Sequence, residues 1–315
     1  MTESRKMHFW FLWLTLLRFM VRADHGVISD VSDETFEFLI SGGYKSHENR
    51  WSRHVVSIRT INYIKSTGDN HFCAGILISS RAVLTAAHCL TDQYKATLKP
   101  RGIQVVFGHL NRLDNYNIKS DSRTADRLMV HPDYERYKKH DLAIIRLHQR
   151  IPRYNPDVQP IMIRRVANLT INNTCVTMGW GQLYQHGPYS DEILFLNVLV
   201  SPPSECQNIL DTYTEGDICV HPDTKGKMCA GDMGGPLICQ GALAGVIAGT
   251  LGCAEGQAMK FVSFLRYKGW VEKTVLQFRN GGGTFSIDIL LFWSWLGTQL
   301  YMLFHYQSRQ ERREL

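Results

Sequence analysis

Short runs of β-branched and aromatic residues recur along the chain between Ile40 and Phe278, and Gly, Pro, Asn and Asp separate them. Runs of this kind at regular spacing predict the strands of an all-β sandwich or barrel. Residues 267–278 differ, because their apolar positions recur at helical spacing and predict a helix that closes the domain. The predicted strands span residues 54–60, 72–79, 103–109, 141–147, 174–180, 237–243 and 245–250.

A short apolar run, residues 9–17, lies near the start of the chain and follows Arg5 and Lys6. Together with the small residues of Val21-Arg22-Ala23, this pattern predicts a secretory signal peptide, residues 1–23. The apolar run is too short for a hydrocarbon core, which needs about 20 residues, so an uncleaved anchor is the weaker interpretation. A short N-terminal pro-segment, residues 24–39, would then precede the main domain, residues 40–278.

A second apolar stretch, residues 289–308, contains no charged residue and as a helix would cover about 30 Å. We expect a linker at residues 279–286, a transmembrane helix at 287–308 and a basic tail at 309–315. The arginines of the tail place it in the cytoplasm, so the domain would be the extracellular part of a single-pass type I protein. An interfacial helix or a docked C-terminal extension is the alternative. A glycolipid-anchor signal fits poorly, because such signals end in the apolar tail.

The chain contains eight cysteines, and none of them belongs to a C-x-x-C pair. An even number in an exported chain predicts disulfides rather than metal ligands, and we expect neither a metal nor a cofactor. Many pairings are compatible with eight cysteines, so their spacing alone leaves the connectivity open. Asn168 and Asn172 each begin an N-x-T sequence and are candidate glycosylation sites of a secreted protein.

The formal net charge of the chain is +6, and residues 1–23 contribute +3 of it through four basic residues and Glu3, which leaves +3 on the rest. Basic pairs such as Lys138-Lys139 and Arg164-Arg165 are isolated along the sequence. A nucleic-acid-binding surface would need its basic residues to be clustered. We therefore expect no nucleic-acid partner.

Four short motifs carry a family resemblance: LTAAHC (84–89), DLAIIRL (141–147), MGWGQ (178–182) and CAGDMGGPL (229–237). In their order and spacing, the chain from Ile40 to Phe278 resembles the trypsin/chymotrypsin family of serine proteases over some three quarters of its length. The resemblance implies two six-stranded antiparallel β-barrels with a C-terminal helix and an active site between the barrels. It also implies four disulfides, which pair Cys73 with Cys89, Cys175 with Cys239, Cys206 with Cys219 and Cys229 with Cys253.

The catalytic triad of that family consists of a serine nucleophile, a histidine base and an aspartate that orients the histidine. His88 and Asp141 match the base and the orienting residue, and Gly231 matches an oxyanion-binding residue. Met233 stands at the nucleophile position. A thioether has no proton to transfer and forms no acyl intermediate that water could hydrolyse, so we expect acyl-enzyme chemistry to be lost. Ser263 and Thr250 lie elsewhere in the pattern, and no sequence feature places a hydroxyl beside His88.

Three further departures from the family pattern agree with this expectation. The specificity pocket would have Lys227 at its floor, where trypsin-like members carry an aspartate, and Thr250 and Met259 in place of wall glycines. Gly249 replaces the tryptophan that flanks the substrate. Activation would require cleavage before Ile40, whose new amine pairs with the aspartate matching Asp232, yet no Arg or Lys lies between Arg22 and Lys45.

These departures predict an inactive trypsin-like protease homologue that binds proteins, namely proteases or protease inhibitors, as a cofactor or decoy. It would be exported and either secreted or held at the cell surface. An active endopeptidase of the same family is the alternative, and it would require a nucleophile other than Met233. A passive extracellular spacer is a third interpretation, which partner capture would separate from the first.

Overall fold

In this computed structural model, the described part of the chain lies between Gly43 and Asn280. The predicted signal peptide, the pro-segment, most of the linker and the segment 287–315 lie outside it. The described part contains no helix long and apolar enough to cross a membrane. The described residues are 43–45, 50–115, 117–136, 138–152, 155–164, 167–223, 226–248, 253 and 258–280.

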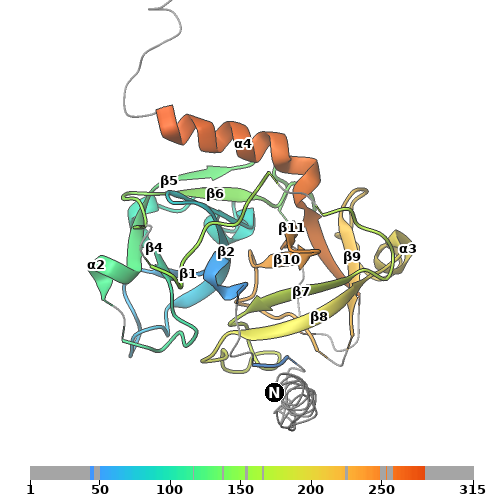
Figure 1. Ribbon diagram of the computed structural model, residues 1–315, viewed down its shortest axis with the longest axis horizontal. Coiled ribbons are helices and arrows are strands. Elements are labelled where there is room, and N and C mark those ends of the chain that lie inside the picture. Colours follow the sequence, from blue (N-terminus) through green and yellow to red (C-terminus); the bar gives the residue numbers. More distant parts are fainter. Residues whose placement is uncertain are drawn as a thin grey trace, which may run out of the picture. The chain divides into compact units, whose positions relative to one another are not determined.

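Twelve strands form two closed antiparallel barrels, which confirms the predicted architecture (Figure 1). The first barrel has the order β1-β2-β3-β6-β5-β4 and the second β10-β11-β12-β9-β8-β7. The strands of the first are β1 (Val55–Thr60), β2 (His71–Ser79), β3 (Ala82–Thr85), β4 (Ile103–Phe107), β5 (Ser122–Val130) and β6 (Ala143–Leu147). Those of the second are β7 (Thr174–Gly179), β8 (Leu194–Val200), β9 (Ile218–Pro222), β10 (Pro236–Cys239), β11 (Ala242–Ile247) and β12 (Met259–Ser263).

The predicted strand at residues 237–243 is wrong as a single element. The structure has a hairpin there, in which β10 ends at Cys239 and β11 begins at Ala242. Gln240 and Gly241 both have positive φ, of 52° and 72°, which is the backbone of a tight two-residue hairpin turn. The sequence pattern does not reveal the turn, because glutamine is not one of the residues typical of such turns.

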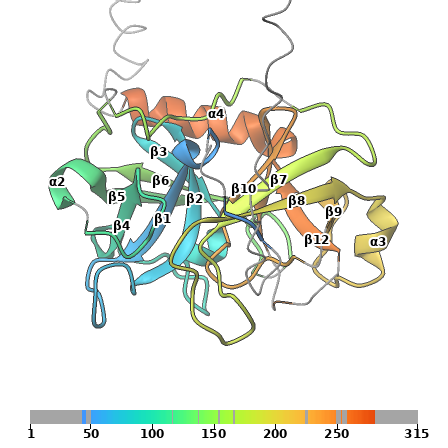
Figure 2. The same cartoon turned by 60° about the horizontal axis from the view of Figure 1, so that its bottom comes forward.

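The C-terminal helix α4 (Phe264–Asn280) packs on β6 of the first barrel and β11 of the second (Figures 1 and 2). Its buried residues Phe264, Tyr267, Val271, Thr274 and Phe278 recur every three or four positions and form one face. The helix is longer than the predicted 267–278, and it includes the first two residues of the expected linker. Shorter helices are η1 (Ser52–His54), η2 (Ala87–Leu90), η3 (Pro100–Gly102), α2 (Ile118–Asp121) and α3 (Pro203–Gln207).

Four disulfides join Cys73 to Cys89, Cys175 to Cys239, Cys206 to Cys219 and Cys229 to Cys253. These are the pairs that the family resemblance implies. The first joins β2 to η2, and the second joins the neighbouring strands β7 and β10. The disulfides therefore fix segments on both sides of the junction between the barrels.

Candidate active site

His88 and Asp141 meet at one end of the strand pair β3–β6. Thr85 pairs with Ala143 in this ladder, so His88 follows the end of β3 while Asp141 precedes the start of β6. The His88 ring nitrogen Nδ1 lies 2.7 Å from Asp141 Oδ2, and the His88 backbone N–H donates to Asp141 Oδ1 at 2.9 Å. Asp141 thus fixes both the backbone and the ring of His88.

Two opposing effects act on the Asp141 carboxyl group. Burial favours its neutral form, but the charge of His88, the two hydrogen bonds from His88 and the more distant Lys260 outweigh burial and keep the pKa of Asp141 below its usual value. An ionised Asp141 accepts the Nδ1 proton of His88 and leaves Nε2 as the basic nitrogen. This is the tautomer that a general base requires. The predicted pair is therefore assembled in the structure.

Met233 occupies the loop before β10 and is 6% exposed. Its carbonyl oxygen accepts a hydrogen bond from the Ala74 backbone N–H of β2 at 2.8 Å, which links the two barrels. The Cys89 sulfur lies 3.8 Å from this carbonyl oxygen and 3.8 Å from His88 Nε2. The backbone of Met233 and the ring of His88 thus flank one sulfur of the Cys73–Cys89 disulfide. Among the described residues, no serine or threonine hydroxyl hydrogen-bonds to His88.

The loop that carries Met233 owes its shape to glycines. Gly231 and Gly234 have φ values of 99° and 84°, in the left-handed region that side chains rarely adopt. A Cβ on Gly234 would lie 2.1 Å from Thr85 Oγ1 and 2.3 Å from the Ala74 carbonyl oxygen. The loop therefore fits against β2 and β3 only with glycine at this position.

A chain of buried hydrogen bonds holds Gly231 from the first barrel. Arg59 Nε donates to Ser57 Oγ at 2.8 Å, and Ser57 Oγ lies 2.9 Å from His71 Nδ1. His71 Nε2 lies 3.2 Å from the Gly231 carbonyl oxygen. Burial, with the charges of Arg59 and Arg112, lowers the pKa of His71 to about 3, so its ring is neutral. A neutral ring accepts from Ser57 and donates to Gly231.

Sequence reasoning missed His71, because a histidine that opens a buried strand has no pattern that distinguishes it from other buried polar residues. Only the fold brings it to Gly231.

The Asp232 carboxyl group lies in a cage of backbone groups. Its oxygens accept hydrogen bonds from the N–H groups of Gly181, at 2.7 Å, and Cys229, at 2.9 Å. A Cβ on Gly179 or Gly181 would lie 2.3 or 2.1 Å from these oxygens. Burial raises the pKa of Asp232 to about 6, although both backbone hydrogen bonds act to lower it. The glycines of MGWGQ thus make room for this carboxyl group.

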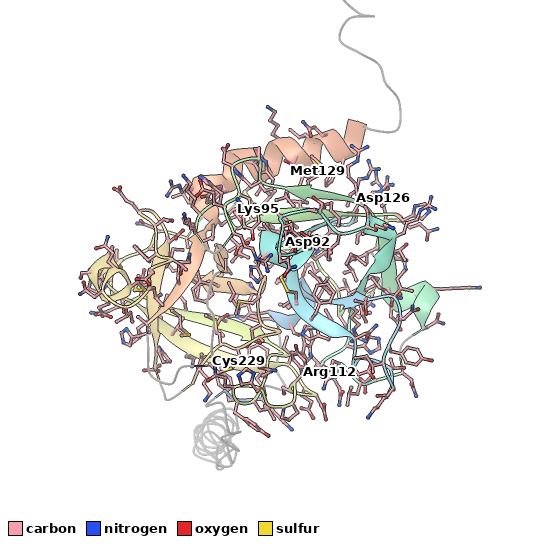
Figure 3. The ribbon with its side chains drawn as sticks, turned by 180° about the vertical axis from the view of Figure 1, so that it is seen from behind. Asp92, Lys95, Arg112, Asp126, Met129 and Cys229 are labelled. Atoms are coloured by element: carbon pink, nitrogen blue, oxygen red, sulfur yellow. A yellow bond between two sulfur atoms is a disulfide. The ribbon has the colours of Figure 1, made fainter. Side chains whose placement is uncertain are left out.

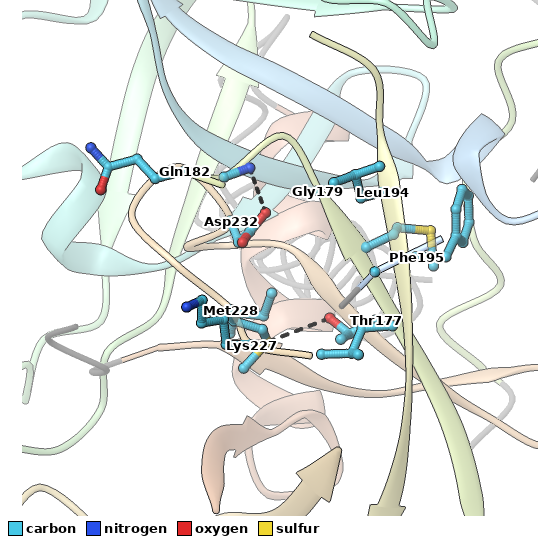
Figure 4. Close-up of a pocket in the computed structure, with 13 residues that line it drawn as sticks. Thr177, Gly179, Gln182, Leu194, Phe195, Lys227, Met228 and Asp232 are labelled. Atoms are coloured by element: carbon cyan, nitrogen blue, oxygen red, sulfur yellow. Dashed lines mark hydrogen bonds between the residues drawn. The ribbon is translucent and has the colours of Figure 1, made fainter. Parts of the chain in front are cut away.

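Asp232 borders a cavity of about 30 Å³, which is the size of one or two water molecules (Figure 4). Lys227 and Met228 line it from the segment before Cys229, and Gly43 lines it from the start of the described chain. Lys227, the predicted pocket floor, is half-buried at this cavity.

The remaining predicted residues are scattered. Met259 is 5% exposed in β12, where it pairs with Val220 of β9. Thr250 and Gly249 lie outside the described residues. Asn168 and Asn172, the candidate glycosylation sites, are both exposed.

Within the described part of the chain, one group of side chains has the spacing of metal ligands: Cys73, His88 and Cys89, whose ligand atoms lie within 4.8 Å of one another. The two sulfurs are bonded to each other. Metal binding by cysteine requires a thiolate, so this group does not match a metal site in its oxidised form.

Comparison with known proteins identifies the family. The family model described as Trypsin matches residues 40–271. Trypsin II-P29 of Gallus gallus is 32% identical over 213 residues, which cover 65% of this chain and 80% of that protein. Serine protease 1 of Homo sapiens is 28% identical over 242 residues, covering 75% of this chain and 89% of that protein. The solved structure titled human heparin binding protein superimposes with a TM-score of 0.60 at 25% identity, and covers 74% of this chain and 95% of that one. The chain therefore belongs to the trypsin/chymotrypsin-like family of serine proteases.

Proposed function

We propose that this protein is a non-cleaving member of its family that acts by binding other proteins. The observation that carries the proposal is Met233, at the family's nucleophile position beside an assembled His88–Asp141 pair. A positioned base increases the rate only if it has a nucleophile to deprotonate. Loss of one triad member leaves about 10³–10⁴-fold acceleration over water, against a triad contribution of about 10⁶. That residual activity is too small for a protease.

The other departures from the family pattern support the proposal. We propose Lys227, Thr250 and Met259 as the residues that close the specificity pocket to basic side chains. Gly249 removes the apolar platform for an extended substrate. The absence of Arg and Lys between Arg22 and Lys45 removes a trypsin-like activation site, so Asp232 would not receive a new N-terminal amine. Gly231 would keep the position of an oxyanion-binding residue, but no acyl intermediate would form for it to stabilise.

We further propose that the protein is exported, with Asn168 and Asn172 as glycosylation sites and residues 287–308 as its membrane anchor. A trypsin-family domain with four disulfides is typical of oxidising compartments. The loops of such a scaffold provide a binding surface that does not depend on catalysis. Proteases and protease inhibitors are the proposed partners, because the fold presents them with the shape of a family member.

A fluorophosphonate probe tests the central claim, because it labels only an activated nucleophile. The native chain, Met233→Ser and the matched control Met233→Ala are each treated with the probe. The same three proteins are also treated after Leu39→Arg and cleavage with trypsin. We expect labelling only of the cleaved Met233→Ser form, because it alone would have a hydroxyl beside His88 and a free Ile40 amine.

The other results of this experiment are equally informative. Labelling of the native chain, at a residue mapped by mass spectrometry, would identify a second nucleophile and establish the active-endopeptidase alternative. Labelling of Met233→Ala would have the same meaning.

A further inference from the structure

A cavity of about 440 Å³ opens beside the C-terminal end of α4, away from the His88–Asp141 site. Val275 and Phe278 line it from the helix, and Ile151, Val158 and Pro160 line it from the segment that follows β6. Its volume falls in the range of about 300–1,000 Å³ that is typical of small-molecule sites. Two serines, a glutamine and two arginines line the cavity together with these apolar side chains. The cavity therefore suits a ligand that has both a hydrocarbon part and a polar part.

Three arginines lie around the apolar side chains of the cavity. Arg81 and Arg150 line the cavity, and the Arg146 guanidinium lies 5.6 Å from the centre of the Phe278 ring. Asp126, on the neighbouring strand β5, pairs with Arg146 at 2.7 Å and with Arg81 at 3.5 Å. Figure 3 shows Asp126 near this end of α4. The Asp126 carboxylate thus pairs with two of the three guanidinium groups, and the four side chains together carry an excess of positive charge.

Arg150 supplies the accessible part of that charge. It is exposed, and within the described part of the chain its side chain makes no hydrogen bond or ion pair. An unpaired guanidinium beside the apolar side chains of this cavity is arranged for a ligand that has an anionic group at one end and hydrocarbon at the other.

The cavity also lies close to the point where the apolar C-terminal stretch leaves the domain. Phe278 lines it, and α4 ends two residues later at Asn280. Residues 281–288 then lead to the uncharged stretch 289–308. Eight extended residues reach at most about 29 Å. A bilayer that contains residues 289–308 therefore lies within reach of the cavity.

We propose that this cavity binds an anionic phospholipid of that bilayer, with an acyl chain against Val275 and Phe278 and the headgroup at Arg150 and Arg81. A sulfated polysaccharide would use the arginines but not the apolar side chains of Val275 and Phe278, which is why the observations favour a lipid. The proposal rests on the membrane anchor of the proposed function, and it does not depend on Met233.

Photo-crosslinking tests it with the full chain in phosphatidylcholine vesicles. One vesicle set contains phosphatidylserine with a photoactivatable acyl chain, and the other contains phosphatidylcholine with the same acyl chain. We expect the anionic probe to label peptides 148–160 and 272–280 at least five times more than the neutral probe, because only its headgroup pairs with the arginines. Residues 289–308 should be labelled equally by both probes.

Two substitutions separate charge from shape. Arg150→Glu should reduce labelling of the cavity peptides at least about fivefold, because each basic residue near a membrane contributes about that factor to the attraction of anionic lipid. The matched control Lys65→Glu changes an exposed residue in the β1–β2 loop, which lies on the side of the first barrel opposite α4 (Figures 1 and 2).

Val275→Trp should fill the cavity and reduce labelling of the cavity peptides, although all the arginines are still in place. Its matched control, Leu276→Trp, changes an exposed neighbouring residue and should leave the labelling of the cavity peptides unchanged.

Several results would overturn the proposal. Equal labelling of the cavity peptides by both probes would remove the role of the headgroup. Labelling of 289–308 without the cavity peptides would remove the lipid site and leave the anchor in place. No association of the chain with vesicles would remove the anchor, and the lipid site with it. Binding of heparin that Arg150→Glu weakens and Val275→Trp does not, without selective lipid labelling, would assign the arginines to a polysaccharide. If Val275→Trp unfolds by circular dichroism, Arg150→Glu decides the outcome, because it changes only a surface residue.

Discussion

At the scale of single residues, the carboxyl group of Asp232 illustrates how a buried acid affects stability. Its pKa is about 6 in the folded protein and about 3.8 in the unfolded chain. As the pH rises, Asp232 therefore loses its proton in the unfolded chain before it does so in the folded protein. Above that pH, the folded protein must either keep the proton on Asp232 or bury the charge of its carboxylate. The Asp232 contribution to the free energy of unfolding is thus complete below about pH 4 and is lost as the pH rises through 6.

His71 acts in the opposite direction, because its pKa is lowered to about 3 and protonation destabilises the fold as the pH falls below 6.5. The Asp232 effect must therefore be measured as a difference between variants. Relative to Asp232→Asn, the native protein should gain up to about 3 kcal/mol in free energy of unfolding between pH 7 and pH 4. Urea unfolding at both pH values measures this. The control Asp157→Asn, at an exposed position, should show no such difference. The prediction would be refuted if the free energy of unfolding changed equally with pH in Asp232→Asn and in the native protein.

A second residue-scale prediction concerns the glycine beside this carboxyl group. Gly181→Ala would place a Cβ 2.1 Å from an Asp232 oxygen, so the cage must open, and we expect a loss of about 3 kcal/mol in the free energy of unfolding. The control is Gly102→Ala, because nothing lies within 4 Å of its added Cβ. Chemical denaturation compares the two. Equal effects would show that the cage is not what requires glycine at position 181.

At the scale of elements, the helix α4 was the easiest to predict and some strands were the hardest. The helix has a 3.6-residue apolar period, which depends on its own sequence alone. Strand β5 contains Arg123, Asp126 and Arg127, which conceal its alternation. Strand β12 buries Lys260, whose ammonium lies 3.7 Å from Asp217 and donates to the Thr212 carbonyl oxygen. Sequence spacing cannot predict such partners, because they come from distant segments.

The buried face of α4 gives a prediction at this scale. Val271 is fully buried and Leu276 is 53% exposed on the same helix. Val271→Ala should lower the free energy of unfolding by about 2 kcal/mol through lost burial and a residual cavity. Leu276→Ala should change it by at most about 0.5 kcal/mol. Thermal unfolding distinguishes the two substitutions. A larger effect at Leu276 would mean that α4 has a partner on its outer face.

At the scale of the whole molecule, the two barrels are joined at the candidate site by backbone and buried polar contacts. Ala74 of the first barrel donates to Met233 of the second, and His71 bonds to Gly231. Sequence motifs located His88, Asp141 and Met233, because the resemblance assigns them position by position. They could not show the contact of His71 with Ser57, which exists only once β1 and β2 pair, or its contact with Gly231, which exists only once the two barrels meet.

The last prediction tests this junction. His71→Ala should lower the free energy of unfolding by about 3 kcal/mol, because it leaves Ser57 and the Gly231 carbonyl group buried without their partner. Hydrogen exchange should also become faster in residues 229–235. The exposed His148→Ala is the control. Unchanged exchange in that loop, with the same loss of stability, would show that His71 stabilises only its own barrel.

The glycine cage around Asp232 also bears on how proteins of this kind are recognised. Gly179 and Gly181 are needed by a carboxyl group about fifty residues further along the chain, and Gly234 is needed by the backbone of β2. None of these requirements involves the side chain at position 233. The short signatures that identify a protease thus record the architecture of a loop rather than the presence of a nucleophile. A chain can therefore keep the glycines and the aspartate of this loop after the residue at the nucleophile position has changed, so these positions alone do not establish protease activity.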